Sequence, residues 1–209
     1  MEIMRVGLDL AKNVFEIYGV DKQEKELLRK VLKRNKVLEF FSQLEPCVVG
    51  IESCGGAHYW ARELRKLGHE VRMMAPQFVA PYRKGQKNDR NDAEAICEAA
   101  ERPNMRFVPI KNEEQQSVLT VHRARALLVG ERTALVNQVR GFLTEYGIVL
   151  PVGRSQVRSQ LPRILEDAEN ALPHLAREVF ADQYARLCEL DRVIGEYDRK
   201  IDAMAKVNE

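Results

Sequence analysis

The chain has 209 residues and a formal net charge of +2, with 45% hydrophobic and 31% charged residues. This length is enough to bury a core, and this composition excludes an intrinsically disordered protein. The four cysteines form no C-x-x-C pair, which argues against a zinc ribbon or a disulfide framework and favours a reducing compartment. No apolar run approaches the roughly 20 residues of a membrane helix, and the N-terminus lacks a signal-peptide pattern. We therefore expect a cytoplasmic protein with no membrane partner.

The charge is unevenly distributed along the chain. Residues 103–160 carry 8 basic and 4 acidic side chains, whereas residues 161–209 carry 7 basic and 11 acidic ones. The middle segment is therefore the better candidate for a surface that faces phosphate groups. The acidity of the last segment is explained more simply by a solvated helix face.

The first hundred residues alternate between short apolar runs and helical patterns, as in α/β domains. The predicted strands are Met4–Leu10, Val14–Val20, Glu26–Lys33, Cys47–Ile51 and Glu70–Met74. The predicted helices are Asn35–Leu44, Ala57–Leu67 and Asp92–Glu101. The second strand closely follows the first, so these two are expected to form a hairpin.

Beyond Pro109 the pattern becomes helical. The predicted helices are Glu113–Tyr146, residues 156–170 and a last long helix that begins at Pro173. Along the last helix, apolar residues recur at alternating steps of three and four, at Leu187, Leu190, Ile194, Tyr197, Ile201 and Met204. This heptad pattern predicts a coiled coil, and a helix packed on its own domain explains it about as well.

Four carboxylates stand where an α/β sheet places ligand-binding side chains. Asp9 lies within the first apolar strand, where an unpaired buried carboxylate is strongly unfavourable. Glu52 directly follows a short buried strand, and acids at such strand ends commonly face ligands. Asp89 and Asp92 are three residues apart at a predicted helix start, which puts both on one face. Taken singly, the first two are also explained as turn or loop acids, and the other two as helix caps.

Together these carboxylates predict a site for divalent metal. Two carboxylates about 4 Å apart repel by roughly 4 kcal/mol at an effective dielectric of about 20, and divalent cations would offset this repulsion. Oxygen ligands alone favour Mg²⁺ or Mn²⁺ over zinc, and a pair of such ions is suited to phosphoryl transfer. Nearby basic residues favour a polyanionic substrate, although a solvated loop explains them as well. These residues are Arg83, Lys84, Lys87 and Arg90.

Three motifs follow one another along the chain. They are Gly7-Leu-Asp-Leu-Ala-Lys12, Gly50-Ile-Glu-Ser-Cys-Gly-Gly-Ala-His-Tyr-Trp60 and Gln86-Lys-Asn-Asp-Arg-Asn-Asp-Ala-Glu-Ala-Ile96. In this order they resemble the three blocks of the DEDD transposases, which are recombinases of bacterial insertion sequences akin to the Piv DNA invertases. The resemblance covers the N-terminal half well and extends weakly over the helices to the end.

The resemblance implies a RuvC-like, RNase H-type domain over residues 1–110, in which the four carboxylates form a catalytic tetrad that binds Mg²⁺ or Mn²⁺. It implies a helical, coiled-coil region over residues 111–209 that forms homodimers or higher homo-oligomers and contacts RNA. It also implies a DNA recombinase directed by a structured bridge RNA. Family members continue into a C-terminal domain with a serine nucleophile, and no serine here lies in a matching context. We therefore expect the sequence to be the N-terminal part of such a recombinase.

A second basic surface is predicted on the first long helix. Arg123, Arg125 and Arg132 are spaced to form a face that contacts the RNA backbone. Salt bridges to the acidic last helix explain these arginines about as well. Two other classes of function stay open, a non-catalytic RNA-binding and dimerisation module and a stand-alone RuvC-like nuclease. Metal-dependent nicking of DNA by this chain alone would favour the nuclease.

Overall fold

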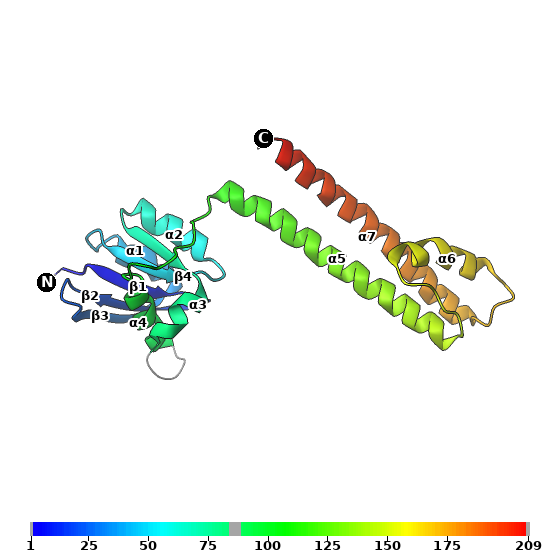
Figure 1. The fold of residues 1–209 in the computed structure, drawn as a ribbon, viewed down its shortest axis with the longest axis horizontal. Coiled ribbons are helices and arrows are strands. Elements are labelled where there is room, and N and C mark those ends of the chain that lie inside the picture. The colour runs from blue at the N-terminus through cyan, green and yellow to red at the C-terminus, as the bar shows by residue number, and fades with distance from the viewer. Residues whose placement is uncertain (1, 84–88, 208–209) are drawn as a thin grey trace. The chain divides into compact units, whose positions relative to one another are not determined.

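The computed structural model describes residues 2–83 and 89–207. The chain divides into two compact units, residues 1–112 and residues 113–209 (Figure 1). All the strands of the described residues belong to the N-terminal unit, and the C-terminal unit is helical.

The N-terminal unit is built on a mixed five-stranded sheet. Its strands are β1 (Arg5–Asp9), β2 (Val14–Val20), β3 (Glu26–Lys33), β4 (Val48–Glu52) and β5 (Glu70–Met74). They lie in the order β3-β2-β1-β4-β5. The pairs β1–β2 and β2–β3 are antiparallel, whereas β1–β4 and β4–β5 are parallel. The predicted fold class, an α/β domain of the RuvC-like, RNase H type followed by helices, is confirmed.

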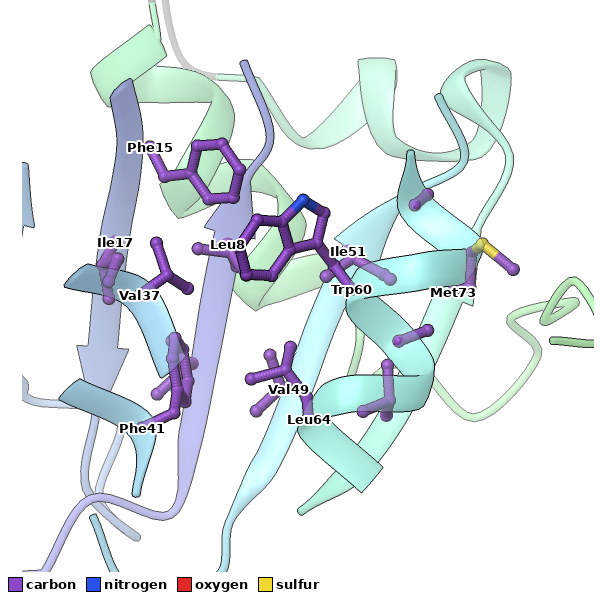
Figure 2. Packing of buried hydrophobic residues seen from close by; sticks show 14 of the residues in the cluster. Leu8, Phe15, Ile17, Val37, Phe41, Val49, Ile51, Trp60, Leu64 and Met73 are labelled. Atoms are coloured by element: carbon purple, nitrogen blue, oxygen red, sulfur yellow. The ribbon is translucent and has the colours of Figure 1, made fainter. Parts of the chain in front are cut away.

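Helices cover both faces of this sheet. They are α1 (Val37–Phe41), α2 (Ala57–Lys66), α3 (Pro76–Val79) and α4 (Asp89–Ala99), with 3₁₀ turns η1 (Arg34–Lys36) and η2 (Ala80–Tyr82). Figure 2 shows the face under α1 and α2, where apolar side chains of the strands pack around Trp60. Because side chains alternate along a strand, Leu8 and Ile51 point into this core while Asp9 and Glu52 point to the opposite face.

α4 packs against that opposite face at two glycines. Gly7 and Gly50 are paired in the register of β1 and β4. A Cβ atom on Gly7 would lie 2.0 Å from the carbonyl oxygen of Ala93, and one on Gly50 would lie 2.8 Å from the Cβ of Ala100. The helix therefore rests directly on the strand backbones, and this contact holds its first turns near the end of β1.

Three helices differ in extent from the predicted ranges. α4 begins at Asp89, so Asp92 lies within its first turn rather than at its start. The segment predicted as one helix over Asn35–Leu44 forms η1 and α1, and α1 ends at Phe41, where the amides of Gln43 and Leu44 bond to carbonyls three residues back. α6 ends at Glu166, where Asn170 and Arg177 cap the last carbonyls, with Asn170 Nδ2 lying 2.6 Å from the oxygen of Ile164.

The C-terminal unit consists of α5 (Glu113–Glu145), α6 (Arg154–Glu166) and α7 (His174–Val207). Its largest buried side chains form one cluster that includes Val139, Leu143, Leu161, Phe180 and Leu187. In the heptad pattern of α7, Leu187, Leu190 and Ile194 are 0%, 2% and 3% exposed, so the first part of the pattern is buried within this chain. Within the described residues, no helix combines the length and apolarity that a membrane crossing requires.

Candidate active site

Asp9 and Glu52 lie side by side at the carboxyl ends of two parallel strands. Leu8 of β1 is paired with Ile51 of β4, so the next residue on each strand is one of the two acids. Both carboxylates face α4 and both residues are partly exposed. The structure therefore brings together two of the four predicted site residues, which are far apart in the sequence.

The other two predicted acids belong to the first turn of α4. Asp89 is the first helical residue, and of this residue only the backbone is described. Asp92 is 7% exposed and accepts a hydrogen bond from Nε of Arg83. The contact of Gly7 with Ala93 places this turn beside the end of β1. A buried carboxylate held by an arginine is a paired charge, which accounts for the burial of Asp92.

The thiol of Cys54 responds to the charge at the ends of β1 and β4. Burial raises the pKa of Cys54, and the negative charges of Glu52 and Asp9 raise this pKa further. Two carboxylates acting on one thiol indicate that the turn after β4 lies close to both acids. Nearby negative charge disfavours the thiolate for the same reason that it favours a bound cation.

Neutralising either acid is therefore expected to lower the pKa of Cys54. In Asp9→Asn and in Glu52→Gln, more thiolate is present at about pH 8, so alkylation of Cys54 should be faster than in the unmutated chain. Peptide-resolved mass spectrometry after timed treatment with iodoacetamide measures this rate. Cys97, whose pKa burial raises to about 11, is the internal control and should react equally slowly in all three proteins. Equal Cys54 rates in all three would contradict the proximity.

One acidic residue of this region was missed by the sequence reasoning. Glu16 lies opposite Asp9 in the register of β1 and β2, on the same face of the sheet. Its neighbours Phe15 and Ile17 are buried in the core, so Glu16 faces away from it. The signal was present in the alternation of the second strand, but the pairing with Asp9 depends on the hairpin register, which the sequence leaves open.

The basic residues predicted near the acids are only partly described. Arg83 is engaged with Asp92. Lys84 and Lys87 lie outside the described residues, and Arg90 is described only as part of the α4 backbone. Their predicted contact with nucleic acid stays a prediction.

Two of the three arginines predicted on the first long helix face α7. Arg125 pairs with Asp198, and Arg132 lies 3.0 Å from Asp191. Arg123 is exposed on α5. The salt bridges that the sequence left open are therefore present, and of these three residues Arg123 has the side chain most available to another molecule.

The donor set at the strand ends fits a hard divalent cation. Asp9 and Glu52 offer only oxygen atoms, which suits Mg²⁺ or Mn²⁺. Within residues 2–83 and 89–207, no group of three or more His, Cys, Asp or Glu side chains is close enough to hold one ion. The described side chains thus supply the pair Asp9 and Glu52 at the strand ends, and the four-residue tetrad stays a prediction.

A sheet of the RNase H type with neighbouring carboxylates at the ends of β1 and β4 defines a RuvC-like domain. Residues 6–148 match the family model of the DEDD transposases of the IS110 type, which is described as a transposase. The chain belongs to this family.

Several curated transposases are similar to most of the chain. It is 50% identical over 204 residues to a "Probable family 20 transposase" of Pseudomonas aeruginosa. It is 39% identical over 208 residues to the "Transposase for insertion sequence element IS1111A" of Coxiella burnetii, and 43% identical over 186 residues to that for IS1328 of Yersinia enterocolitica. These alignments cover 97%, 100% and 88% of this chain and 60%, 57% and 55% of the relatives. The chain thus spans somewhat more than half the length of the relatives it matches.

Proposed function

We propose that this chain is the N-terminal part of an RNA-guided DNA transposase that cuts and rejoins DNA with divalent metal. The observation that carries the proposal is the juxtaposition of Asp9 and Glu52 on parallel strands, with the first turn of α4 held beside them by Gly7. In this proposal Asp9, Glu52, Asp89 and Asp92 are the catalytic tetrad, and the family membership supports that assignment.

The tetrad would hold Mg²⁺ or Mn²⁺. Such ions, when bound, supply charge that activates a nucleophile and stabilises a leaving oxygen in phosphoryl transfer. The carboxylates of Asp9 and Glu52 hold their positions because each residue ends a strand that is paired with a neighbouring strand on both sides. Arg83 is a positioning residue, since its guanidinium binds the carboxylate of Asp92 and orients it in the first turn of α4.

Residues 111–209 serve RNA contact and self-association in this proposal. Exposed Arg123 and the basic excess of residues 103–160 support contact with a polyanion. Arg125 and Arg132 are paired with carboxylates of α7, so their predicted contact with RNA has less support. Exposed apolar residues of the helical unit support a homodimer or higher homo-oligomer. The most exposed of these are Leu127, Val149, Val152 and Leu175.

A metal titration tests the tetrad. Saturating Mg²⁺ or Mn²⁺, at about 100 times the dissociation constant, is expected to stabilise the N-terminal unit by about 2.7 kcal/mol through mass action. Asp9→Asn should lose most of this gain, whereas Glu45→Gln, in an exposed turn before the other end of β4, should keep it. Thermal unfolding followed by the fluorescence of Trp60, the chain's one tryptophan, measures the effect. A midpoint that no concentration of either metal moves would count against the proposal.

The second candidate function is a non-catalytic module that binds RNA and self-associates. The observation that favours it is the pair between Arg83 and Asp92, which neutralises one predicted ligand without any metal. A nicking assay on supercoiled DNA separates the candidates, since the non-catalytic module leaves the DNA intact with either metal. Metal-dependent nicking by this chain alone, lost in Glu52→Gln, would indicate instead that the domain works as a stand-alone nuclease.

A further inference from the structure

Three arginines of the helical unit converge on a single carboxylate. Asp191 of α7 accepts a hydrogen bond of 3.0 Å from Nη1 of Arg132. Nη1 of Arg154 and Nη1 of Arg158 each lie 3.5 Å from an oxygen of the same carboxylate. Arginine stays protonated at every physiological pH, so three guanidinium groups and one carboxylate leave a local charge of about +2.

Two of these arginines, and Arg140 further along α5, have a buried N–H group without a hydrogen-bond partner. These groups are Nε of Arg132, Nε of Arg140 and Nη1 of Arg158, whose contact with Asp191 is an ion pair and not a hydrogen bond. A buried donor without a partner is unfavourable, and so is an excess of like charge. Both conditions would be relieved by one anion that brings several acceptor oxygens.

A pocket of about 280 Å³ lies where these groups meet. Arg132, Arg140 and Arg154 line it, together with Asn137 of α5 and Gly153 at the start of α6. Gly153 is the N-cap of α6 and has a φ of 124°, and no side chain caps the first amides of this helix. The positive end of the helix therefore adds to the arginine charge at the same place.

We propose that this arginine pocket, lined by Arg132, Arg140 and Arg154 with Arg158 next to Arg154 at the carboxylate of Asp191, binds a phosphate group of a nucleic-acid backbone. The proposal rests on the proposed function, which gives the helical unit a nucleic-acid partner. Planar guanidinium groups match phosphate oxygens in geometry, and a phosphate supplies both the missing charge and the missing acceptors. RNA and DNA share this chemistry, so either strand type is a possible source of the phosphate.

Two other arginines of the unit, Arg125 and Arg192, do not share these features. Arg125 is matched by Asp198, and Arg192 is matched by both Glu189 and Glu196. Their charges are neutralised within the chain, whereas the pocket's charge is not. The site is thus a local feature of the junction between α5, α6 and α7 and not a property of basic residues in general.

Binding of labelled hairpins tests the pocket. Fluorescence anisotropy is measured over a range of salt with an RNA hairpin and a DNA hairpin of the same sequence. The double variant Arg154→Gln/Arg158→Gln is expected to bind about tenfold more weakly at low salt, with a slope of log affinity against log salt shallower by about 1 to 2. Arg192→Gln is the matched control, because it removes an equally exposed arginine from α7, and its affinity should stay within about twofold.

Removing the carboxylate instead of the arginines should change hairpin affinity in the opposite direction, which gives an independent check. Asp191→Asn removes the one carboxylate of the cluster, so it should bind the hairpins more tightly than the unmutated chain, provided that circular dichroism shows native helix content. The hairpin that responds to these variants identifies the source of the phosphate. If Arg154→Gln/Arg158→Gln binds both hairpins as Arg192→Gln does, the proposal is overturned.

A failure of the arginine pocket to bind hairpins can be told apart from a failure of the proposed metal site. Asp9→Asn is expected to keep full hairpin binding while losing metal stabilisation, because the two sites belong to different units. Hairpin binding that survives in Asp9→Asn and falls in the arginine variant supports the pocket whatever the metal titration shows.

Discussion

Replacing Gly7 with alanine is expected to destabilise the N-terminal unit by about 3 kcal/mol or more. The new Cβ would lie 2.0 Å from the carbonyl oxygen of Ala93 and 2.5 Å from the amide nitrogen of Cys97. Both are backbone atoms of α4, so no rotamer change can relieve the overlap and the helix itself must move. Urea unfolding followed by the fluorescence of Trp60 measures the change, because this tryptophan is packed in the sheet core.

Two other glycines set the scale for this prediction. Gly50→Ala should cost less, because its Cβ would meet the Cβ of Ala100 at 2.8 Å and the oxygen of Ile96 at 3.0 Å. Gly55→Ala should stay within about 0.5 kcal/mol, since nothing lies within 4 Å of the added atom. A Gly7→Ala protein as stable as Gly55→Ala would contradict the packing of α4 on β1. A displaced α4 would also shift Asp92 relative to Asp9. The proposed stabilisation by metal should therefore be lost in Gly7→Ala even if the domain still folds.

The sheet was predictable because each strand carries its own local signal. Val14–Val20 alternates cleanly, and the observed strand has the predicted bounds. Glu26–Lys33 alternates poorly, yet it forms β3, since an edge strand is buried on fewer sides and needs less apolar patterning. The shift of the α4 start to Asp89 was not predictable, because several good capping residues occur in succession there.

The candidate site was predictable in its parts and not in its pairings. Asp9 and Glu52 stood out because a carboxylate beside a buried strand requires a partner. The ion pair between Arg83 and Asp92 could not be predicted from the sequence, because it depends on the path of the chain between β5 and α4. The pairing of Arg125 and Arg132 with carboxylates of α7 was likewise open, because a basic helix face is compatible with a partner in the same chain or in another molecule.

The heptad pattern of α7 shows the same limit. Periodic apolar residues indicate that one face of a helix is buried, and they carry no information on which helix buries it. In this structure the ion pairs Arg125–Asp198 and Arg132–Asp191 run in opposite directions along α5 and α7, as in an antiparallel helix pair of one chain. The apolar face that they flank is therefore part of the chain's own core.

The double replacement Leu190→Asp and Ile194→Asp is accordingly expected to unfold the helical unit rather than to yield a folded monomer. Both side chains are almost fully buried, and two unpaired carboxylates in that place should cost more than about 5 kcal/mol. Circular dichroism should show a large loss of helix, while Trp60 fluorescence should show the N-terminal unit still folded. Leu127→Asp, on a side chain that is 66% exposed on α5, is the matched control and should change stability by less than about 0.5 kcal/mol. A double variant that keeps its helix content and becomes monomeric would show that the pattern joins two chains after all.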